Sequence, residues 1–523
     1  ALFNYATGDR VPIISEMDMN RDASYQNRYA LILRPAVPMK MGARHVMALT
    51  RDLTDSAGKT LKSPDAFRVL RDRIPTTNLL IEAVRPRYEA IFAMLEKHGY
   101  PRDRLLLAWD FSVASKDYLL GSVLSMRETV MTEALGTGLG YTITRVRENP
   151  DSHLSRLVEG TFQVPTYLNG KSSITYDQNH HPIRQYPNQS FPFTMIVPKV
   201  AKTRTGPLPL VIFGHGIFGT ANEYLEGWAS ATIHPLANEN GFVIVATDWI
   251  GMSANDQELI VKEVMTDLNR ISLVTDRLQQ SLINFLTLTE LAVGPLGADP
   301  KVTVGWGPLV DLTRVYYHGA SLGGIQGSSL AALSRRISRV VLAVPGSSWL
   351  NMITRSIVWN QLKLVAGVSY PDPLALQVVI AFLQTMFDHS DPINLSLMLF
   401  EEPLPDAPAN RAVLIQESIG DSLVPNMTTE LLVRARGIPL VTPSITQPYG
   451  ISLVDAASAR SALVQYKLPS WNNPQPPETN IPPDRDNGVH ADVVFMSNVK
   501  KQLSRFLQTG EIEQFCDGAC DPD

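Results

Sequence analysis

The chain has 523 residues, with 46 lysines and arginines against 51 aspartates and glutamates and a formal net charge of −5. This length predicts at least two domains with room for a large core. The slightly acidic balance gives no reason to expect nucleic acid or an anionic membrane as a partner. No apolar run reaches the ~18 residues that would span a membrane; the longest candidate is Leu374–Phe387.

Residues 1–135 contain short strand-like runs separated by turn residues. The runs are Tyr29–Arg34, His45–Thr50 and Leu105–Ser112. This spacing is typical of a small β-sandwich. The apolar spacing within Tyr88–His98 predicts a helix inserted before the last strand, and Lys116–Leu135 predicts a second helix leading out of the domain.

Residues 155–515 change to an alternation of strands and helices. Val158–Val164 and Phe191–Val197 are expected to pair antiparallel at the start. The following strands are expected at Leu208–Phe213, Phe242–Thr247, Val315–His318, Val340–Val344 and Val413–Gln416. Helices are expected at Ala221–Asn238, Gln257–Ala292, Leu322–Leu333, Met427–Arg436 and Asp492–Leu507. Nearly continuous apolar strands are typical of a parallel sheet covered on both faces, which predicts an α/β domain.

One connection in this domain is unusually long. About 65 residues separate Pro345 from Ala412, where two to six are ordinary. The segment 347–410 is rich in large apolar side chains, which must be buried against something. We expect a helical cap over an active site, lining an apolar acyl pocket, because α/β enzymes bind ligands beyond the carboxyl ends of their strands. A structural subdomain that only packs on the sheet is the alternative.

The most informative motif is Gly319–Gly323, which reads Gly-Ala-Ser-Leu-Gly. It lies between the expected strand Val315–His318 and the expected helix Leu322–Leu333. G-x-S-x-G between a strand and a helix is the nucleophile elbow, a sharp turn that exposes the serine hydroxyl above the sheet. We therefore expect Ser321 to be a nucleophile rather than part of a plain glycine turn.

A serine nucleophile needs a base, and the base needs an orienting carboxylate. In this arrangement the chain order is Ser, then Asp or Glu, then His. Only His389 and His490 follow Ser321. His490 lies just before the last amphipathic helix, where the base is expected, whereas His389 is interpreted as a surface or capping residue.

Asp421 is the candidate acid, because it follows the strand Val413–Gln416 and should emerge at the carboxyl end of the sheet. Glu417 is the nearest rival, but it lies within or just beyond the strand. A helix-capping role is the alternative for Asp421.

The loop Gly214–Thr220 is the candidate oxyanion loop. Attack on an ester creates an oxyanion that requires aligned backbone N–H donors, and we expect these from Ile217 and from Leu322, the residue after the nucleophile. His215, like His318 beside the elbow, is interpreted as structural. Trp349 and Phe218 are the candidate substrate-binding side chains.

The only two cysteines are Cys516 and Cys520, in a five-residue loop near the end of the chain. A local disulfide is favoured, with free thiols as the alternative. A disulfide would indicate an oxidising compartment. No further ligands for a metal lie nearby, and neither a metal nor a cofactor is expected.

Together, the motifs at Gly214–Thr220, Gly319–Gly323 and Gly420–Pro425 resemble the oxyanion loop, elbow and acid loop of α/β-hydrolases. The resemblance is to bacterial lipases and esterases of the His-Gly-x type. One departure is Ala320, where many lipases carry His, and we expect it to affect pocket shape more than chemistry. Residues 1–135 resemble, less specifically, the Ig-like N-terminal domains of some secreted or lipid-anchored bacterial lipases, through Leu53–Leu61 and Trp109–Ser112.

The resemblance implies a cofactor-free serine carboxylic-ester hydrolase (an esterase or lipase) exported from a bacterium. It would act through an acyl-enzyme on a small-molecule or lipid ester with an apolar acyl group. An acyltransferase, or an amidase or peptidase with the same triad, is one alternative. A non-catalytic binding protein on this fold is another, and the sequence does not indicate the oligomeric state.

Overall fold

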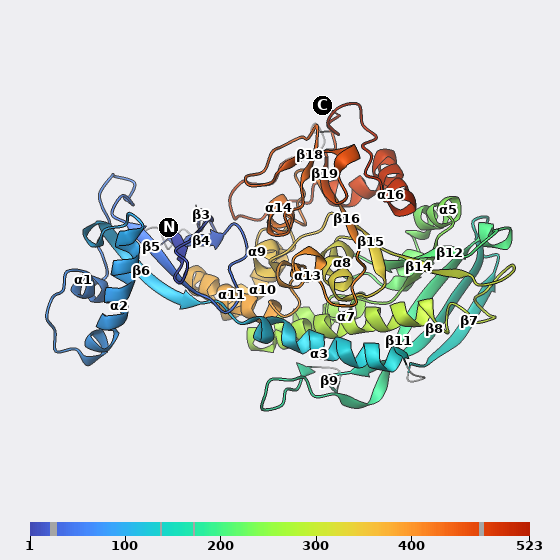
Figure 1. Ribbon diagram of the computed structural model, residues 1–523, viewed down its shortest axis with the longest axis horizontal. Helices are drawn as coiled ribbons and strands as arrows, with labels where there is room; N and C mark the ends of the chain where they lie inside the picture. The colour runs from blue at the N-terminus through green and yellow to red at the C-terminus, as the bar shows by residue number, and fades with distance from the viewer. Residues whose placement is uncertain (21–28, 136–138, 171–172, 470–474, 523) are drawn as a thin grey trace. The chain divides into compact units, whose positions relative to one another are not determined.

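The computed structural model describes residues 1–20, 29–135, 139–170, 173–469 and 475–522 (Figure 1). The chain divides into two compact units. The first comprises residues 1–17 and 31–119, and the second comprises residues 18–30 and 120–523.

The first unit contains two small antiparallel sheets. Its larger sheet has the order β2 (Arg10–Val11), β1 (Leu2–Asn4), β5 (Arg44–Thr50) and β6 (Leu105–Ser112), and the smaller pairs β3 (Ile13–Met17) with β4 (Leu31–Pro35). The core of this unit combines strand residues such as Val46 and Ala108 with Phe67 of α1 (Asp65–Arg71) and Phe92 of α2 (Leu79–Lys97). The larger sheet therefore packs against helices, and the Ig-like resemblance stays a prediction.

The second unit is built on one large sheet with eleven strands among the described residues. In spatial order they are β18 (Leu453–Asp455), β17 (Leu440–Thr442), β19 (Ala462–Tyr466), β16 (Ala412–Ser418), β15 (Ile337–Ala343), β14 (Val310–Ala320), β12 (Leu208–Gly214), β13 (Val243–Ala246), β11 (Gln185–Pro198), β8 (Leu154–Thr166) and β7 (Tyr141–Glu148). The strands from β13 to β18 pair in parallel, whereas β7, β8, β11 and β13 pair antiparallel.

Helices cover both faces of this sheet, which is why its central strands are apolar along their whole length. On one face, Val341 and Leu414 share a core with Ala237 of α5 (Ser230–Asn240) and with Leu503 of α16 (Ser497–Thr509). Figure 1 shows α5 and α16 beside each other. On the other face, α8 (Leu322–Leu333) contacts β14 and β15 and packs on α7 (Ser272–Val293).

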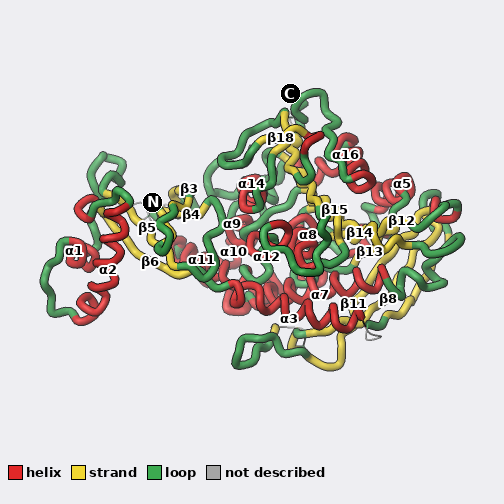
Figure 2. Tube along the Cα trace, in the orientation of Figure 1, coloured by secondary structure: helices red, strands yellow, loops and turns green. Residues whose placement is uncertain are grey.

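The strand order, with antiparallel strands at one edge and β12 and β13 exchanged in sequence, is that of the α/β-hydrolase fold. This confirms the fold class predicted from the sequence. Figure 2 shows the strands of the sheet lying among helices of both layers. The carboxyl ends of β12, β14 and β16 meet at one edge, because the three strands run in parallel with only β15 between β14 and β16.

The long connection after β15 is helical. It contains α9 (Trp349–Ile353), α10 (Trp359–Ser369), α11 (Pro373–Phe387), α12 (Pro392–Leu395) and α13 (Leu397–Phe400). Trp349 and Phe387 are buried, but Leu364 and Val368 are 77% and 84% exposed. The expectation that its apolar side chains would all be buried therefore fails for parts of α10 and α11, where Phe382 is also exposed.

Two long helices expected from the sequence are interrupted. Ala221–Asn238 is divided into α4 (Ala221–Leu225) and α5, and Gln257–Ala292 begins with short α6 (Gln257–Leu259) and a π-helical turn before α7. A Cβ at Gly227 would lie 2.6 Å from the Glu223 carbonyl oxygen, so the chain bends there around a residue without a side chain. No single helix in the described ranges is long and apolar enough to cross a membrane; α10 and α11 meet that test only jointly, bent by 110°.

Candidate active site

Ser321 lies at the sharp turn between β14 and α8, as the motif predicts. Its backbone has φ 56° and ψ −121°, a conformation that non-glycine residues rarely adopt. Its N–H donates to the Ala343 carbonyl of β15 across 3.0 Å. A Cβ at Gly323 would lie 2.1 Å from the Gly214 carbonyl oxygen, and one at Gly319 would lie 2.5 Å from the Tyr317 hydroxyl. The turn therefore requires glycine on both sides of the serine.

Asp421 and His490 are brought together although 69 residues separate them. His490 Nδ1 donates to Asp421 Oδ2 across 2.6 Å, and both side chains are buried. Asp421 Oδ1 accepts from the N–H groups of Leu423 and Val424 at 2.8 and 2.9 Å. The carboxylate is therefore fixed by the start of its own loop and presents its second oxygen to the imidazole.

The two loops that carry this pair are tied to each other by polar side chains that the sequence analysis missed. Asn487 Nδ2 donates to the Gly420 carbonyl at 2.7 Å, and the Ser422 hydroxyl donates to Asp486 at 2.8 Å. Asn426 accepts from the Gly420 N–H at 2.8 Å. The cluster of Asn, Ser and Asp beside both predicted residues is the signal that could have indicated these contacts.

The second ring nitrogen of His490, Nε2, is not engaged by Asp421. Because Nδ1 donates its proton to Asp421, Nε2 is the acceptor of the neutral ring. Nε2 is buried and has no hydrogen-bond partner within the described part of the chain. Ser321 and His490 lie on the wall of the same cavity. An imidazole in this state can accept the proton of a serine hydroxyl.

The loop after β12 lies next to the serine. A Cβ at Gly216 would come within 3.8 Å of Ser321 Cβ. Ile217 and Leu322 line a small cavity together with Ser321. The Leu322 N–H is the first of α8 and has no intrahelical acceptor, and Ile217 N–H has no hydrogen bond within the described residues. These two amides are available to an oxyanion.

Phe218 has a different environment from Ile217. Its N–H donates to the Met252 carbonyl at 2.8 Å, and its φ is 55°. Its side chain lines neither of the two cavities at Ser321. The structure therefore brings Trp349, but not Phe218, to a cavity wall beside the serine.

Of the two remaining histidines near the site, His215 is buried and His318 is partly buried. His215 Nδ1 donates to the Gly216 carbonyl at 2.7 Å, and its Nε2 accepts from the Trp249 N–H at 2.8 Å, so the ring fixes the loop. Burial lowers the pKa of His215, and burial lowers the pKa of His318 to about 4. Both rings are therefore neutral near pH 7. His389 lies in the turn after α11 and lines neither cavity.

Two cavities of unequal size meet at Ser321. The larger, of about 260 Å³, lies between the sheet and helices α4, α5 and α16. The smaller, of about 50 Å³, lies between the start of α8 and the helical connection after β15. The larger is lined mainly by apolar side chains, among them Val211, Phe213, Ile233, Leu236, Ile244, Ala320, Ala343, Val499, Leu503 and Leu507.

Asp391 fixes the part of the helical connection that reaches the small cavity. Its carboxylate accepts from the N–H groups of Ser348, Trp349 and Ile393 at 2.8–3.0 Å, and from the Gln384 amide at 3.0 Å. Backbone N–H groups at the start of two helices thus share one buried carboxylate. This holds Trp349 at the cavity wall.

Cys516 and Cys520 are joined by a disulfide near the end of the chain. The Cys520 carbonyl accepts from the Lys467 N–H at 3.0 Å, which attaches this loop beside the end of β19. Among the described residues, no group of three or more His, Cys, Asp or Glu side chains is placed to hold a metal ion.

No protein-family model matches the chain, and no curated protein matches it. Among solved structures, an acetyl xylan esterase from a Paenibacillus species is 13% identical, with 67% of this chain and 91% of that chain covered and a TM-score of 0.39. Acetyl xylan esterase 1 from a Thermoanaerobacterium species is 16% identical over 66% and 86%, with a TM-score of 0.36. An S-formylglutathione hydrolase from Agrobacterium tumefaciens is 14% identical over 63% and 93%, with a TM-score of 0.31. Likenesses this weak carry no weight for reaction or substrate.

Proposed function

We propose that the protein is a serine carboxylic-ester hydrolase that acts through an acyl-enzyme. The observation that carries this proposal is the joint placement of Ser321, on its strained turn, and His490, held by Asp421, on one cavity wall. The unpartnered N–H groups of Ile217 and Leu322 support it. A binding protein would have no need of this combination of strain and buried polar groups.

In the proposed reaction, Ser321 Oγ attacks the ester carbonyl carbon as its proton passes to His490 Nε2. The carbonyl oxygen becomes an oxyanion between the N–H groups of Ile217 and Leu322. The bond to the alcohol oxygen then breaks, and that oxygen takes the proton from Nε2 and leaves as the alcohol. Water repeats the sequence on the acyl-enzyme, giving the free acid and restoring the serine hydroxyl. Asp421 stabilises the imidazolium in both halves.

We include three finer features in the proposal. The helical connection after β15 acts as a cap, because Trp349, Met352 and Ile353 line the small cavity at Ser321. The substrate has an apolar part, because the large cavity is mainly apolar. The Cys516–Cys520 disulfide supports export to an oxidising compartment.

A fluorophosphonate probe tests the proposal, because it phosphonylates only an activated serine. We expect one adduct per chain by intact mass, located at Ser321 by peptide mapping. Ser321→Ala should abolish the adduct and leave the melting temperature nearly unchanged. Ser347→Ala is the matched control and should label as the parent does, since the Ser347 hydroxyl is engaged by the Thr428 carbonyl. A parent protein that resists the probe, or that is labelled elsewhere, contradicts the proposal.

A further inference from the structure

Ser321 stands between two cavities that differ in size and in the catalytic groups on their walls. His490 lines the larger cavity and not the smaller. Leu322 lines the smaller cavity and not the larger, and Ile217 lines both. An ester bound at Ser321 therefore has its two halves in unlike surroundings.

The chemistry of acylation decides which half enters which cavity. When the tetrahedral intermediate collapses, His490 Nε2 must give its proton to the alcohol oxygen, so this oxygen lies within hydrogen-bond reach of the ring. The alcohol must then leave on the His490 side, which is the wall of the large cavity. The oxyanion lies between Ile217 and Leu322, and the acyl group takes the remaining direction, into the small cavity.

We propose that the substrate is an ester of a short acyl acid with a long, apolar alcohol. This deepens the proposed function and rests on it, and it reverses the sequence-based expectation that the acyl half is the long one. A volume on the order of 30 Å³, that of a water molecule in the liquid and similar to a methylene group, sets the scale. The small cavity of about 50 Å³ then fits an acetyl or propionyl tail, and the large one of about 260 Å³ fits roughly eight carbons.

The shape of the large cavity agrees with an extended alkyl chain. Along α16 its wall runs from Val499 to Leu507, which spans about 12 Å at 1.5 Å per residue. Across from α16, Leu236 of α5 lines the cavity. Next to Ser321 the wall is formed by the small side chains of Ala320 and Ala343. Ala320, the residue before the nucleophile, thus lines the cavity in which the alcohol half would bind.

Two isomeric esters separate the halves with no difference in atom count: octyl acetate and ethyl octanoate. We expect kcat/KM to be at least about tenfold higher for octyl acetate, because each methylene buried in the large cavity contributes up to about fourfold. Lengthening the alcohol of an acetate from two to eight carbons should raise kcat/KM steadily. Equal rates, or faster hydrolysis of ethyl octanoate, would overturn the proposal.

Filling each cavity separately provides the second test. Leu503→Trp and Leu236→Trp should lower kcat/KM for octyl acetate at least tenfold relative to kcat/KM for ethyl acetate. Ile353→Trp, in the small cavity, should lower kcat/KM for ethyl butyrate relative to kcat/KM for ethyl acetate. The preference for esters of octyl alcohol should remain. Leu364→Trp, at a position that is 77% exposed, is the matched control and should change neither profile. If Leu503→Trp instead lowers kcat/KM for ethyl octanoate and not for octyl acetate, the large cavity holds the acyl half.

Binding to the Ser321→Ala variant tests the site without turnover. Calorimetry should detect 1-octanol, with competition by longer alcohols and loss of binding in the Ser321→Ala, Leu503→Trp double variant. Octanoate should bind more weakly than 1-octanol; the opposite order contradicts the proposal. These results are independent of the labelling test. A protein that fails to label at Ser321 refutes the proposed function, whereas one that labels but prefers ethyl octanoate refutes only this inference.

Discussion

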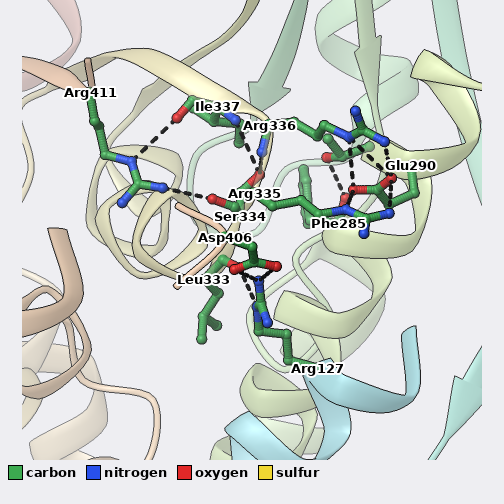
Figure 3. A network of polar contacts seen from close by, with 11 residues as sticks. Arg127, Phe285, Glu290, Leu333, Ser334, Arg335, Arg336, Ile337, Asp406 and Arg411 are labelled. Carbon is green, nitrogen blue, oxygen red and sulfur yellow. Dashed lines mark hydrogen bonds and ion pairs between the residues drawn. The ribbon is translucent and has the colours of Figure 1, made fainter. Parts of the chain in front are cut away.

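Buried carboxylates at the two ends of the strands in the large sheet have different kinds of partner. At the amino ends of β15 and β16, arginines and carboxylates form a dense network (Figure 3). Glu290 of α7 accepts from Arg335 at 2.9 Å and from Arg336 at 3.0–3.2 Å. At the carboxyl ends, Asp421 is bonded to the His490 ring and to backbone amides.

Two buried glutamates show the difference directly. Burial opposes ionisation of Glu290, but hydrogen bonds from Arg335 and Arg336 lower its pKa overall. Glu417, at the carboxyl end of β16, is buried near Glu430 and bonded to the Gln465 amide, and burial raises its pKa to about 8. The same side chain is therefore an anion at one end of the sheet and a neutral acid at the other.

Helix α8 joins the two ends. Its final carbonyls are held by cations: Arg127 Nε donates to Leu333 O at 2.6 Å, and Arg411 donates to Ser334 O at 2.7 Å (Figure 3). Cations at a helix C-terminus are favourable for its dipole. Its other end begins at Ser321, with strained backbone and a cavity on each side. From this comparison we expect substitutions at the amino ends to affect mainly stability, and substitutions at the carboxyl ends to affect mainly the proposed reaction.

The largest expected effects come from the carboxyl ends. His490→Ala should lower kcat by at least about 10²–10⁴-fold, because the serine loses its base. Asp421→Asn should also lose orders of magnitude, because the amide no longer selects the productive tautomer of the ring. Both are measured as initial rates of ester hydrolysis.

His389→Ala is the matched control for the base and should retain activity, because His389 lies after α11 and away from both cavities. If His389→Ala is the more damaging of the two histidine variants, the assignment of the base is wrong.

Glu290→Gln should lower stability and leave kcat nearly unchanged, in contrast to His490→Ala and Asp421→Asn. Removing one partner of a buried pair leaves two guanidinium groups without their carboxylate, at a cost of about 3–5 kcal/mol. Chemical denaturation should show this loss at pH 7, while kcat stays within a few fold. Because the folded-state pKa of Glu290 is lowered, its contribution is complete above the unfolded pKa and is lost as the pH falls through the folded pKa. A stability deficit that persisted undiminished in acid would contradict this account.

Arg411→Met should have a smaller effect of the same kind. It leaves the Ser334 and Ile337 carbonyls without their guanidinium donor, which costs about 1–3 kcal/mol. The methionine keeps most of the buried volume. A drop in melting temperature with unchanged kcat is expected; a drop in kcat alone would mean that this end of α8 acts on the chemistry.

Much of the candidate site could be predicted, because its residues occur in the chain order that the fold requires. Ser321, Asp421 and His490 each come after a strand of the sheet, and short motifs mark the turns. The polar residues Asn487 and Ser422 are a visible signal in the sequence, but the partners of their hydrogen bonds are not, because these depend on how two distant loops meet.

The large cavity also could not be predicted from the sequence. Its walls include α4, α5, α16 and five strands, and many of its lining residues, such as Val211 and Leu503, are ordinary core residues when taken alone. The sequence instead predicts the apolar pocket in the connection after β15, although this connection lines only the smaller cavity. Composition indicates which side chains are apolar, but packing decides where space is left between them.

The smallest expected effect sharpens the comparison of the two glutamates. Because Glu417 has a raised pKa in the folded protein, the unfolded chain loses its proton first as the pH rises. Wild-type stability should therefore fall from about the unfolded pKa of 4.5 up to about pH 8 through this group, and then level off. Glu417→Gln keeps a neutral side chain of the same shape and removes this loss. The variant should match wild type near pH 4.5 and melt at a higher temperature near pH 8, with kcat little changed. A variant that is less stable at pH 8 would show that Glu417 is ionised in the folded state and that the two ends of the sheet do not differ as proposed.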